Sequence, residues 1–513
     1  MRIDAASGRS SEVSAEEYAR QRLFADSVRD LANKPRSYCV VTYGCQMNAH
    51  DGEKLAGLLR SMDMVEADRD TADVVIFNTC CVRENAERRA LGNIKWAAHR
   101  RAEHTGFLLG VCGCMAQEAG GSFEAANMFP EADFVFGTHN LHCLPEYMLR
   151  ALTEPGRVSE VWDGAEACIA EEVPVRRNSR HRAFVNIMFG CNNYCSYCIV
   201  PYVRGRERSR APEAILAESE ALLKDGVQEI MLLGQNVNSY GHDLSSGCGA
   251  QLHLVRGGGA EPRASGCGAQ PHLVRGGGAE PRANGETFAR LLQKLDALGV
   301  PRIRFMTSHP KDMSDDLIAA MALGRGICKH IHLPVQSGSD AILRAMNRGY
   351  GGAQYLERVR ALRSAIPGVG ITSDIIVGFP GETDSDFEDT LALAEEARFD
   401  AAYTFIYSPR KGTRAAQLPG RVDPDISAAR IQKLIETQER QTRRALESLV
   451  GTRQTVLADE ISRRDKTQVS GKCDRAISVS LPGDAQYIGK FIDVVITSIG
   501  HNTLRGEAID RNE

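Results

Sequence analysis

Three features are missing from the 513-residue sequence, and each absence excludes a class of protein. No apolar run approaches the roughly 20 residues that are needed to cross a bilayer. Residues 1–22 mix arginine with acidic residues and have no apolar core, which argues against a secretory signal or a transit peptide. The net charge is −4, so composition alone does not indicate a nucleic-acid partner. We therefore expect a cytoplasmic protein without a membrane partner, with a polar, solvated or weakly helical extension over residues 1–35.

Cysteine, in contrast, is abundant, with fifteen in the chain. Disulfides explain this number poorly in a chain without an export signal, because the cytoplasm keeps thiols reduced. Metal binding or redox chemistry explains it better. The chain is long enough for about three domains, and the positions of the cysteines within those domains decide between the possibilities.

The first predicted domain, over residues 36–150, alternates strand-like and helical segments. Its strand-like runs lie at 38–41, 74–77, 107–111 and 134–137. This alternation predicts a parallel sheet covered by helices. Cys45, Cys80 and Cys114 each come just after the carboxyl end of a strand, and those ends share one edge of a parallel sheet. We therefore expect the three cysteines to converge. A polar linker is expected over 151–180.

A second alternating series covers residues 181–445. Its strand-like runs lie at 183–188, 229–233, 302–306, 330–333, 371–377 and 403–406. Six strand–helix units predict a partial (β/α)6 barrel with its active site at the carboxyl ends of the strands. One segment interrupts the series, because residues 246–264 are repeated almost unchanged as 265–283. This insert is rich in Gly, Pro and Arg and has no apolar period, so we expect a disordered loop over 246–283.

The chain changes character after a polar helical stretch at 423–449. Short strand-like runs at 455–457, 476–479 and 491–497 are separated by turns that contain glycine. They predict a small antiparallel β-barrel over 447–511. The expected fold class is therefore α/β, with an N-terminal parallel α/β domain, a central partial barrel and a small C-terminal β-barrel.

The residues with the clearest chemistry are Cys191, Cys195 and Cys198, spaced C-x3-C-x2-C just after the first strand of the central barrel. Thiolates hold iron–sulfur clusters, and three on one short loop leave one iron of a [4Fe-4S] cluster free for a substrate. The amino and carboxylate groups of S-adenosylmethionine are the obvious candidates. A zinc site is the alternative, but zinc usually takes a fourth Cys or His at a typical spacing, and none lies nearby.

With this motif at the end of a first barrel strand, the chain resembles the radical S-adenosylmethionine superfamily. Further runs narrow the resemblance to its methylthiotransferases, from about residue 36 to the C-terminus except for the insert. These runs are Y-G-C-Q-M-N at 43–48, N-T-C-C-V-R-E at 78–84, G-C-M-A-Q at 113–117, G-C-N-N-Y-C-S-Y-C-I-V-P-Y-V-R-G-R-E-R-S-R at 190–210, L-L-G-Q-N-V-N-S-Y at 232–240, T-S-H-P at 307–310, L-P-V-Q-S-G-S at 333–339 and D-I-I-V-G-F-P-G-E-T at 374–383.

The resemblance implies two [4Fe-4S] clusters and S-adenosylmethionine as cofactors. One cluster, which reduces S-adenosylmethionine to a 5′-deoxyadenosyl radical, would be held by the catalytic cysteines Cys191, Cys195 and Cys198. The auxiliary, sulfur-handling cluster would be held by Cys45, Cys80 and Cys114. The neighbouring Cys81 and Cys112 are expected to point away from it.

The implied reaction is methylthiolation of C2 of N6-(dimethylallyl)adenosine at position 37, in the anticodon loop of tRNA. The implied partners are tRNA and an electron donor such as flavodoxin or ferredoxin, and the chain is expected to be a monomer. A methylthiotransferase acting on threonylcarbamoyladenosine or on a ribosomal-protein aspartate is one alternative. A non-catalytic iron–sulfur regulator that binds RNA is another, although the presence of all six cysteines argues against it.

Seven further residues lie at strand ends or beside the cluster motif, where they could contact S-adenosylmethionine. Tyr197 could pack on the adenine or be a core residue, and Gln235 and Asn236 could bind the amino-acid part or cap a turn. Gln336 and Ser337 could meet the ribose, and Gly378 and Glu382 could approach the adenine. These seven candidates are Tyr197, Gln235, Asn236, Gln336, Ser337, Gly378 and Glu382.

Two groups of basic residues are candidates for RNA contact. Four alternate beside the cluster motif, where one or two could meet the cofactor carboxylate or RNA and the rest form a solvated basic edge. Four others lie in the C-terminal barrel, which resembles a TRAM module, a small RNA-binding barrel. The first group is Arg204, Arg206, Arg208 and Arg210, and the second is Lys472, Arg475, Lys490 and Arg505.

Overall fold

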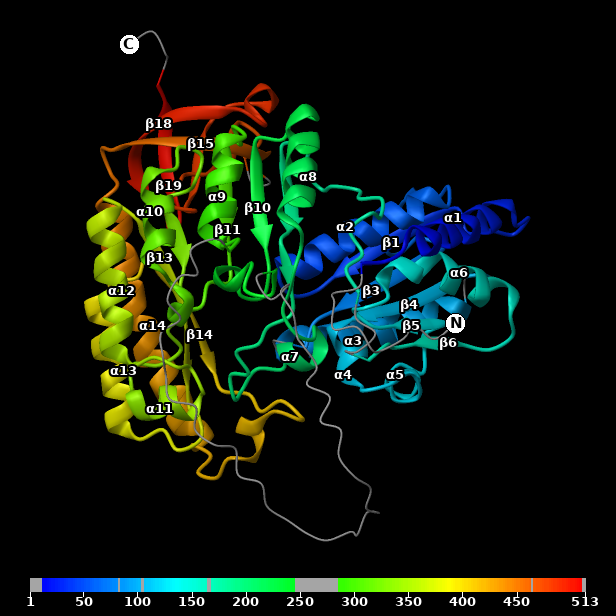
Figure 1. The fold of residues 1–513 in the computed structure, drawn as a ribbon, viewed down its shortest axis with the longest axis horizontal. Helices are drawn as coiled ribbons and strands as arrows, with labels where there is room; N and C mark the ends of the chain where they lie inside the picture. The colour runs from blue at the N-terminus through cyan, green and yellow to red at the C-terminus, as the bar shows by residue number, and fades with distance from the viewer. Residues whose placement is uncertain are drawn as a thin grey trace, which may run out of the picture.

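A computed structural model describes residues 12–81, 84–102, 106–163, 168–244, 285–462 and 465–509 (Figure 1). The duplicated insert predicted over 246–283 lies outside these residues. In Figure 1 the N-terminal α/β domain, the central barrel and the C-terminal β-barrel occupy separate regions, with the α/β domain beside the central barrel. Among the described helices, none combines the length and the apolar character that crossing a membrane requires.

The N-terminal domain is a six-stranded parallel sheet in the order β2-β1-β3-β4-β5-β6. One face carries an apolar cluster shared with α1, α2 and α6, and the other carries a cluster shared with α3, α4 and α5. The strands are β1 (Ser37–Thr42), β2 (Val65–Glu66), β3 (Val74–Thr79), β4 (Leu108–Gly113), β5 (Phe134–Phe136) and β6 (Val158–Glu160). The helices are α2 (Gln46–Ser61), α3 (Glu84–Ala98), α4 (Cys114–Glu118), α5 (Ser122–Met128) and α6 (Leu144–Thr153).

The N-terminal domain extends beyond its predicted bounds on both sides, into the extension expected to be solvated or weakly helical and into the expected linker. The polar extension contains a helix, α1 (Ala15–Asp30), capped by the hydroxyl of Ser14 and packed on α6 through buried residues such as Tyr18 and Val28. The linker expected from residue 151 begins inside α6 and contains β6, which pairs with β5. Both segments are polar on the outside only, because each buries a narrow apolar face that composition does not reveal.

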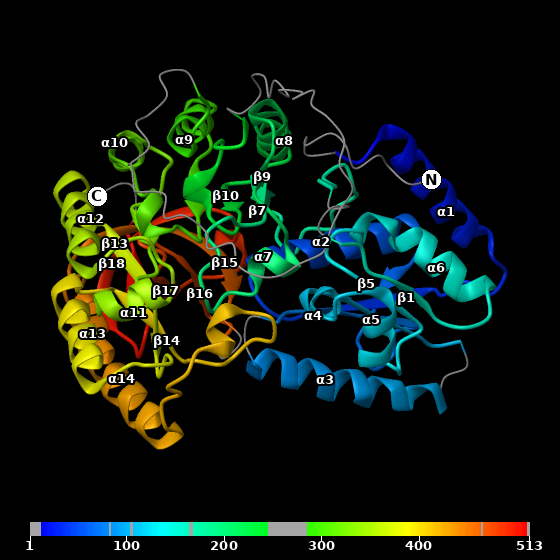
Figure 2. The same ribbon diagram turned by 60° about the horizontal axis from the view of Figure 1, so that its bottom comes forward.

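The central domain is a partial barrel of six parallel strands, as predicted. Two three-stranded sheets, β7-β10-β11 and β12-β13-β14, are linked by a bridge between Ile303 and Ile327. Figure 2 shows the flanking helices as an arc around these strands. The strands are β7 (Arg182–Asn186), β10 (Glu229–Leu233), β11 (Arg302–Phe305), β12 (His330–His332), β13 (Gly370–Val377) and β14 (Ala401–Ile406). The helices are α8 (Pro212–Lys224), α9 (Phe288–Ala297), α10 (Asp315–Leu323), α11 (Asp340–Ala345), α12 (Gly352–Ala365), α13 (Asp384–Ala397) and α14 (Pro424–Glu447).

The C-terminal domain is a closed five-stranded barrel in the order β15-β16-β17-β19-β18. The prediction of a wholly antiparallel barrel is wrong at one pair, because β17 and β19 run parallel and close the barrel. The predicted strand at 476–479 begins late, since Ala476 has a φ of +63° and lies in a turn. The strands are β15 (Arg453–Ile461), β16 (Gln468–Lys472), β17 (Ser478–Pro482), β18 (Phe491–Ile499) and β19 (Leu504–Ala508).

This barrel docks on the amino ends of the central strands through the turn between β16 and β17. Arg302 donates hydrogen bonds to the carbonyls of Lys472 (2.8 Å) and Thr455 (3.0 Å). Arg304 donates to the carbonyl of Cys473 at 2.7 Å, and Arg475 forms an ion pair with the buried Asp400 at 2.6 Å. Arg475, predicted as a candidate for RNA contact, therefore has a structural partner in the central domain.

Candidate active site

The loop that carries Cys191, Cys195 and Cys198 (residues 190–198, the cysteine loop) follows β7 and a short strand, β8 (Met188–Phe189). It begins at Gly190, whose φ is +73°. A Cβ atom there would lie 2.0 Å from a backbone carbonyl oxygen, that of Arg206, so a larger residue does not fit. The cysteine loop is thereby held at the carboxyl ends of the barrel strands.

A buried positive charge lies against the cysteine loop. The buried guanidinium of Arg348 lies 3.3 Å from the Sγ atom of Cys195 and donates to the Tyr197 hydroxyl at 3.4 Å. Burial raises the pKa of Cys191 and of Cys198 to about 12. The guanidinium of Arg348 thus places a positive charge beside Cys195, and the thiols of Cys191 and Cys198 would release their protons on binding a metal.

Tyr197 is half-buried at the edge of an apolar cluster that contains Met346 and Phe379. The backbone amide of Ser196 also donates to the carbonyl of Met346, at 2.9 Å. Of the two interpretations from the sequence, the core role is therefore present in the structure. Contact between the Tyr197 ring and an adenine stays a prediction.

Gln235 and Asn236 lie directly after β10 and face two different domains. The Gln235 amide nitrogen donates to the Sδ atom of Met47 in α2, at 3.2 Å. The Asn236 amide nitrogen donates to a carboxylate oxygen of Asp312 at 2.7 Å. Gln235 therefore lies at the contact with the N-terminal domain, whereas Asn236 is held within the central domain.

Gln336 and Ser337 follow β12. Gln336 has a φ of +72° and pairs through its backbone with Asp374 and Ile376 of β13. The Ser337 hydroxyl is fully buried and lies 3.2 Å from that of Thr390 in α13. The expectation that Ser337 meets the ribose does not agree with this geometry, because its hydroxyl turns into the wall of the barrel.

Gly378 and Glu382 form a tight turn after β13. Gly378 has a φ of +73°, and its amide donates to a carboxylate oxygen of Glu382 at 2.7 Å. The same carboxylate oxygen accepts from Arg430 of α14 at 2.8 Å. Burial raises the pKa of Glu382 in spite of these donors. The turn is thus fixed against α14.

Three of the predicted cofactor contacts have buried oxygens without a hydrogen-bond partner within the described part of the chain. They are Gln235 Oε1, Asn236 Oδ1 and Glu382 Oε1. Buried acceptors without a donor are costly, so such atoms point to a ligand that supplies N–H or O–H groups. The amino and hydroxyl groups of S-adenosylmethionine fit this requirement.

Cys45, Cys80 and Cys114 lie at the carboxyl ends of three adjacent strands, β1, β3 and β4. The amide oxygen of Asn48 is 3.6 Å from the Sγ atom of Cys45 and 4.0 Å from that of Cys114. A Cβ atom on Gly44 would lie 2.8 Å from the Sγ atom of Cys80. The three thiols thus come together at one edge of the sheet, and a donor set of thiols alone suits an iron–sulfur cluster.

Arg204 connects the two groups of cysteines. It follows α7 (Val200–Val203), directly after the cysteine loop, and its buried side chain reaches the N-terminal domain. There it donates to Asn48 Oδ1 at 3.1 Å and to Asp51 Oδ2 at 2.8 Å. The neighbouring Cys81 thiol and the charge of Arg204 lower the pKa of Cys114 to about 6, against the effect of burial.

The two neighbouring cysteines behave differently from each other. Cys112 lies in β4 and points into the apolar cluster shared with α1 and α6, away from Cys114 as predicted. The same prediction is wrong for Cys81, which is buried in the same apolar cluster as Cys114 and lies close enough to its thiol to lower the pKa of Cys114. β3 ends at Thr79, so the strand alternation that would have turned Cys81 away no longer applies.

The predicted solvated basic edge is mostly buried, because the segment pairs as β9 (Arg208–Ser209) with β8 between the two domains. Of its four arginines, only Arg206 is exposed. Arg208 donates to the carbonyl of Arg204 at 3.3 Å, and Arg210 pairs with Glu218 at 2.7 Å. Arg204 therefore joins the two domains, whereas Arg208 and Arg210 brace the segment within the central domain.

The sequence interpretation missed Arg348 and Asn48. Asn48 ends the Y-G-C-Q-M-N run, so its place in the motif was a usable signal. Arg348 follows α11 in a stretch with no recognised motif, and only the fold brings it to Cys195.

Comparisons with known proteins follow the same three domains. Residues 185–394 match the Radical SAM superfamily, residues 37–137 match the Uncharacterized protein family UPF0004, and residues 447–509 match the TRAM domain. The first match implies a [4Fe-4S] cluster and S-adenosylmethionine, and the second suggests a further cluster.

Curated relatives match almost the whole chain. The tRNA-2-methylthio-N(6)-dimethylallyladenosine synthase of Caldicellulosiruptor saccharolyticus is 44% identical over 478 residues, which cover 93% of this chain and 93% of the relative. The chain belongs to this synthase family. The synthases of Clostridium tetani and of Thermoanaerobacter sp. are each 43% identical, over 94% and 97% of this chain and over 99% and 98% of the relatives.

Solved structures support the fold of this synthase-family chain. The radical S-adenosylmethionine methyltransferase TsrM from Kitasatospora setae superimposes with a TM-score of 0.51 at 13% identity. The alignment covers 74% of this chain and 77% of TsrM. At this identity the likeness concerns the arrangement of helices and strands alone.

Proposed function

We propose that the chain catalyses methylthiolation of C2 of N6-(dimethylallyl)adenosine at position 37 of tRNA. The observation that carries the proposal is the contact between the two cysteine-bearing domains at Arg204, which follows the cysteine loop and α7 in the chain and whose side chain reaches Asn48 and Asp51 of the N-terminal domain. The reaction needs a radical source next to a sulfur donor, and two linked sites meet that need. The relatives' name, which denotes this product, supports the choice of substrate.

In this proposal Cys191, Cys195 and Cys198 hold the radical-generating cluster. The auxiliary cluster takes the set Cys45, Cys80 and Cys114. When bound, the clusters and S-adenosylmethionine supply the carbon radical that removes the inert C2 hydrogen, together with the sulfur and the methyl group. The protein's part is to bind and orient the reactants and to exclude water.

The chain's own residues have separate tasks in positioning S-adenosylmethionine. Gln235, Asn236 and Glu382 offer buried acceptors to its amino and hydroxyl groups. At Gln336 and Gly378 the backbone can come close to S-adenosylmethionine, since both residues have left-handed φ angles. These assignments, with Tyr197 beside the adenine, complete the proposed cofactor site.

The proposed partners are tRNA and a one-electron donor such as flavodoxin or ferredoxin, for a monomer in the cytoplasm. On the C-terminal barrel, Lys490 and Arg505 have exposed side chains that suit RNA phosphates. Arg475 is engaged with Asp400 instead, so the RNA surface of this barrel is narrower than the basic residues of its sequence suggest.

The test is product analysis with full-length, anaerobically reconstituted protein. The protein is incubated with S-adenosylmethionine, a reductant and tRNA carrying N6-(dimethylallyl)adenosine, and the tRNA is digested to nucleosides for mass spectrometry. We expect a methylthio group on that adenosine and about eight irons per chain, as two four-iron clusters require. If 5′-deoxyadenosine forms without methylthioadenosine, the substrate assignment is wrong. tRNA with threonylcarbamoyladenosine tests the alternative substrate, and tRNA with unmodified adenosine is the control.

A further inference from the structure

A groove of about 880 Å³ lies at the amino ends of β13 and β14, on the opposite end of the barrel from the cysteine loop. Its walls come from the end of α12, the end of α13, α14 and the turn between β16 and β17. Five arginines and two acidic residues line it. They are Arg363, Arg398, Arg440, Arg444, Arg475, Glu395 and Asp400.

The positive charge of this groove (the arginine groove) is only partly neutralised by the acidic residues that line it. Asp400 pairs with Arg475 and Glu395 with Arg440. The remaining three arginines have no carboxylate within 4.0 Å in the part of the chain that the structure describes. They are Arg363, Arg398 and Arg444.

Arg363 illustrates the positive electrostatic potential in the arginine groove. One of its guanidinium nitrogens donates to the carbonyl of Arg398 at 2.9 Å, which ties it to the end of α13 without removing its charge. Burial lowers the pKa of Arg363, and the charges of Arg398 and Arg475 act in the same direction against that of Asp400. A local excess of three positive charges in a chain of net charge −4 indicates a site for an anion.

A second observation points to a ligand in the same place. Gln441 of α14 lines the groove, is only 9% exposed, and has neither its amide nitrogen nor its amide oxygen hydrogen-bonded within the described residues. A buried amide with both atoms unpaired costs stability unless a ligand supplies an acceptor and a donor.

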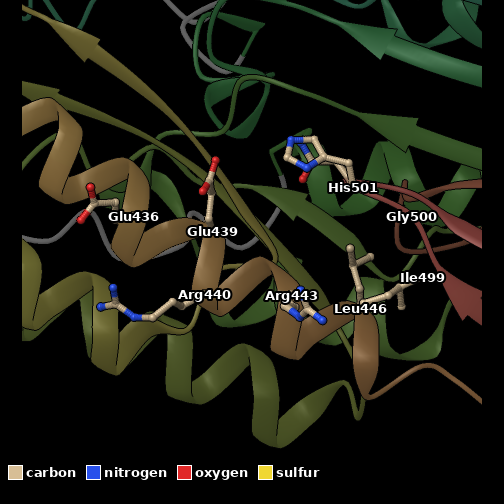
Figure 3. A pocket seen from close by; sticks show the side chains of 9 residues that line it. Glu436, Glu439, Arg440, Arg443, Leu446, Ile499, Gly500 and His501 are labelled. Atoms are coloured by element: carbon tan, nitrogen blue, oxygen red, sulfur yellow. The ribbon is translucent and has the colours of Figure 1, made fainter.

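A neighbouring groove of about 490 Å³, between α14 and the turn that joins β18 to β19, serves as a contrast. Figure 3 shows Glu436, Glu439, Arg440 and Arg443 projecting from α14, with His501 on the turn. Acidic and basic residues balance there. The unneutralised charge is therefore a property of the arginine groove, not of α14 as a whole.

We propose that the arginine groove binds the phosphodiester backbone of RNA. Guanidinium groups match phosphate oxygens in pairs of hydrogen bonds. The amide of Gln441 matches a ribose 2′-hydroxyl, which both donates and accepts. RNA thus satisfies both the charge and the unpaired amide, whereas inorganic phosphate satisfies mainly the charge.

The distance between the groove and the cysteine loop indicates which part of the RNA the groove would hold. This step rests on the proposed function, in which the modified adenosine reaches the cysteine loop. β13 has eight residues, so the two ends of the barrel are about 26 Å apart at ~3.3 Å per residue. RNA that occupies both ends must extend beyond the anticodon loop, so the groove holds the adjoining stem.

The first experiment compares Arg398→Gln/Arg444→Gln with Arg360→Gln, which changes an exposed arginine of α12 that pairs with Glu396. Binding of unmodified full-length tRNA is measured against salt concentration. Each lost phosphate contact lowers the slope of log K against log [salt] by about 0.7–0.9. We expect the double variant to lose about 1.4–1.8 of slope, and the control to keep the wild-type slope. An anticodon-loop hairpin with a short stem should bind both variants alike.

Equal slopes for the double variant and the control would overturn the proposal. So would binding by inorganic phosphate alone, detected as phosphate-dependent thermal stabilisation of the wild type that the double variant lacks, with tRNA binding unchanged. Formation of 5′-deoxyadenosine without tRNA should be the same in all variants. Because tRNA binding is measured without turnover, the salt dependence of binding still tests the groove even if the substrate assignment is wrong.

The second experiment changes Gln441→Met, which removes the amide at nearly constant volume. Since the amide has no partner within the described residues, the midpoint of thermal unfolding should hold or rise. Affinity for full-length tRNA should fall several-fold. A lower midpoint with unchanged tRNA affinity would assign Gln441 a structural role and contradict the proposal.

Discussion

Arg204 and Asp51 form a buried ion pair of 2.8 Å across the boundary between the central barrel and the N-terminal domain. Arg204 belongs to the segment that follows the cysteine loop, and Asp51 to the helix that follows Cys45. A substitution at either residue is therefore expected to disturb the positions of both groups of cysteines.

Arg204→Gln should weaken the auxiliary site. It leaves the Asp51 carboxylate buried without its partner, which costs about 3–5 kcal/mol. The measurement is iron per chain in a background where Cys191, Cys195 and Cys198 are alanine, so that only the auxiliary site contributes. The exposed Arg206→Gln is the control and should keep its iron. Retention of iron and of thermal stability by Arg204→Gln would show that the ion pair does not organise this site.

Cys80→Ser should halve the iron content, from about eight to about four per chain, because one of two four-iron clusters loses a ligand. Formation of 5′-deoxyadenosine should persist, since the cysteine loop is unchanged. Cys112→Ser is the matched control, because Cys112 faces the apolar cluster and not Cys114. Loss of iron in the Cys112 variant, with none in the Cys80 variant, would reverse the ligand assignment.

Gly190→Ala and Gly226→Ala separate steric clash from backbone strain. Both glycines have positive φ, +73° and +86°, so alanine costs roughly 1–2 kcal/mol at either site. Only at Gly190 would the new Cβ atom also meet a carbonyl oxygen, at 2.0 Å, whereas nothing lies within 4 Å at Gly226. Gly190→Ala should lose S-adenosylmethionine cleavage and Gly226→Ala should keep it. Equal cleavage by the two variants would show that the loop tolerates the shift.

His330 should make stability depend on pH where the C-terminal barrel docks. Burial and the charge of Arg304 lower its pKa to about 3, against about 6.5 in an unfolded chain. The unfolded state therefore binds the proton more tightly, so the stability contribution is present above pH 6.5 and is lost as the pH falls below it. His330→Gln should reduce the loss between pH 7 and pH 5 by about 2 kcal/mol. Urea unfolding at pH 7 and pH 5 measures the free energy of unfolding, and the exposed His99→Gln is the control. If His330→Gln loses as much stability between the two pH values as the wild type, the prediction is wrong.

Much of the fold was predictable because strand and helix alternate with clear apolar runs. All six strands of the central barrel lie where these runs indicate. The failures share a cause, namely segments whose apolar face is short. α1 buries residues such as Tyr18 and Val28 within an otherwise polar stretch, and β6 has only three residues. Their packing partners are distant in sequence, so local composition cannot reveal them.

The candidate site was predictable where a strand end or a tight loop determines position. The convergence of the cysteines after β1, β3 and β4 follows from the parallel sheet alone. The contact of Arg348 with Cys195 joins residues 153 positions apart, and no pattern in the sequence indicates it. Ser337 lies at a strand end too, but its side chain is directed to Thr390. Strand ends thus predict location, whereas side-chain direction needs the surrounding packing.

The docking of the C-terminal barrel through Arg302, Arg304 and Arg475 has a consequence for how a base is selected. A module fixed to the amino ends of the central strands is a constant distance from the chemistry at their carboxyl ends. Under the proposed function, the distance between the two ends of the barrel then selects the nucleotide, because RNA held at one end would present at the other only the nucleotide at the matching distance. In that arrangement the position of the target along the RNA would be set by a length, and the identity of the base by the residues around the cysteine loop.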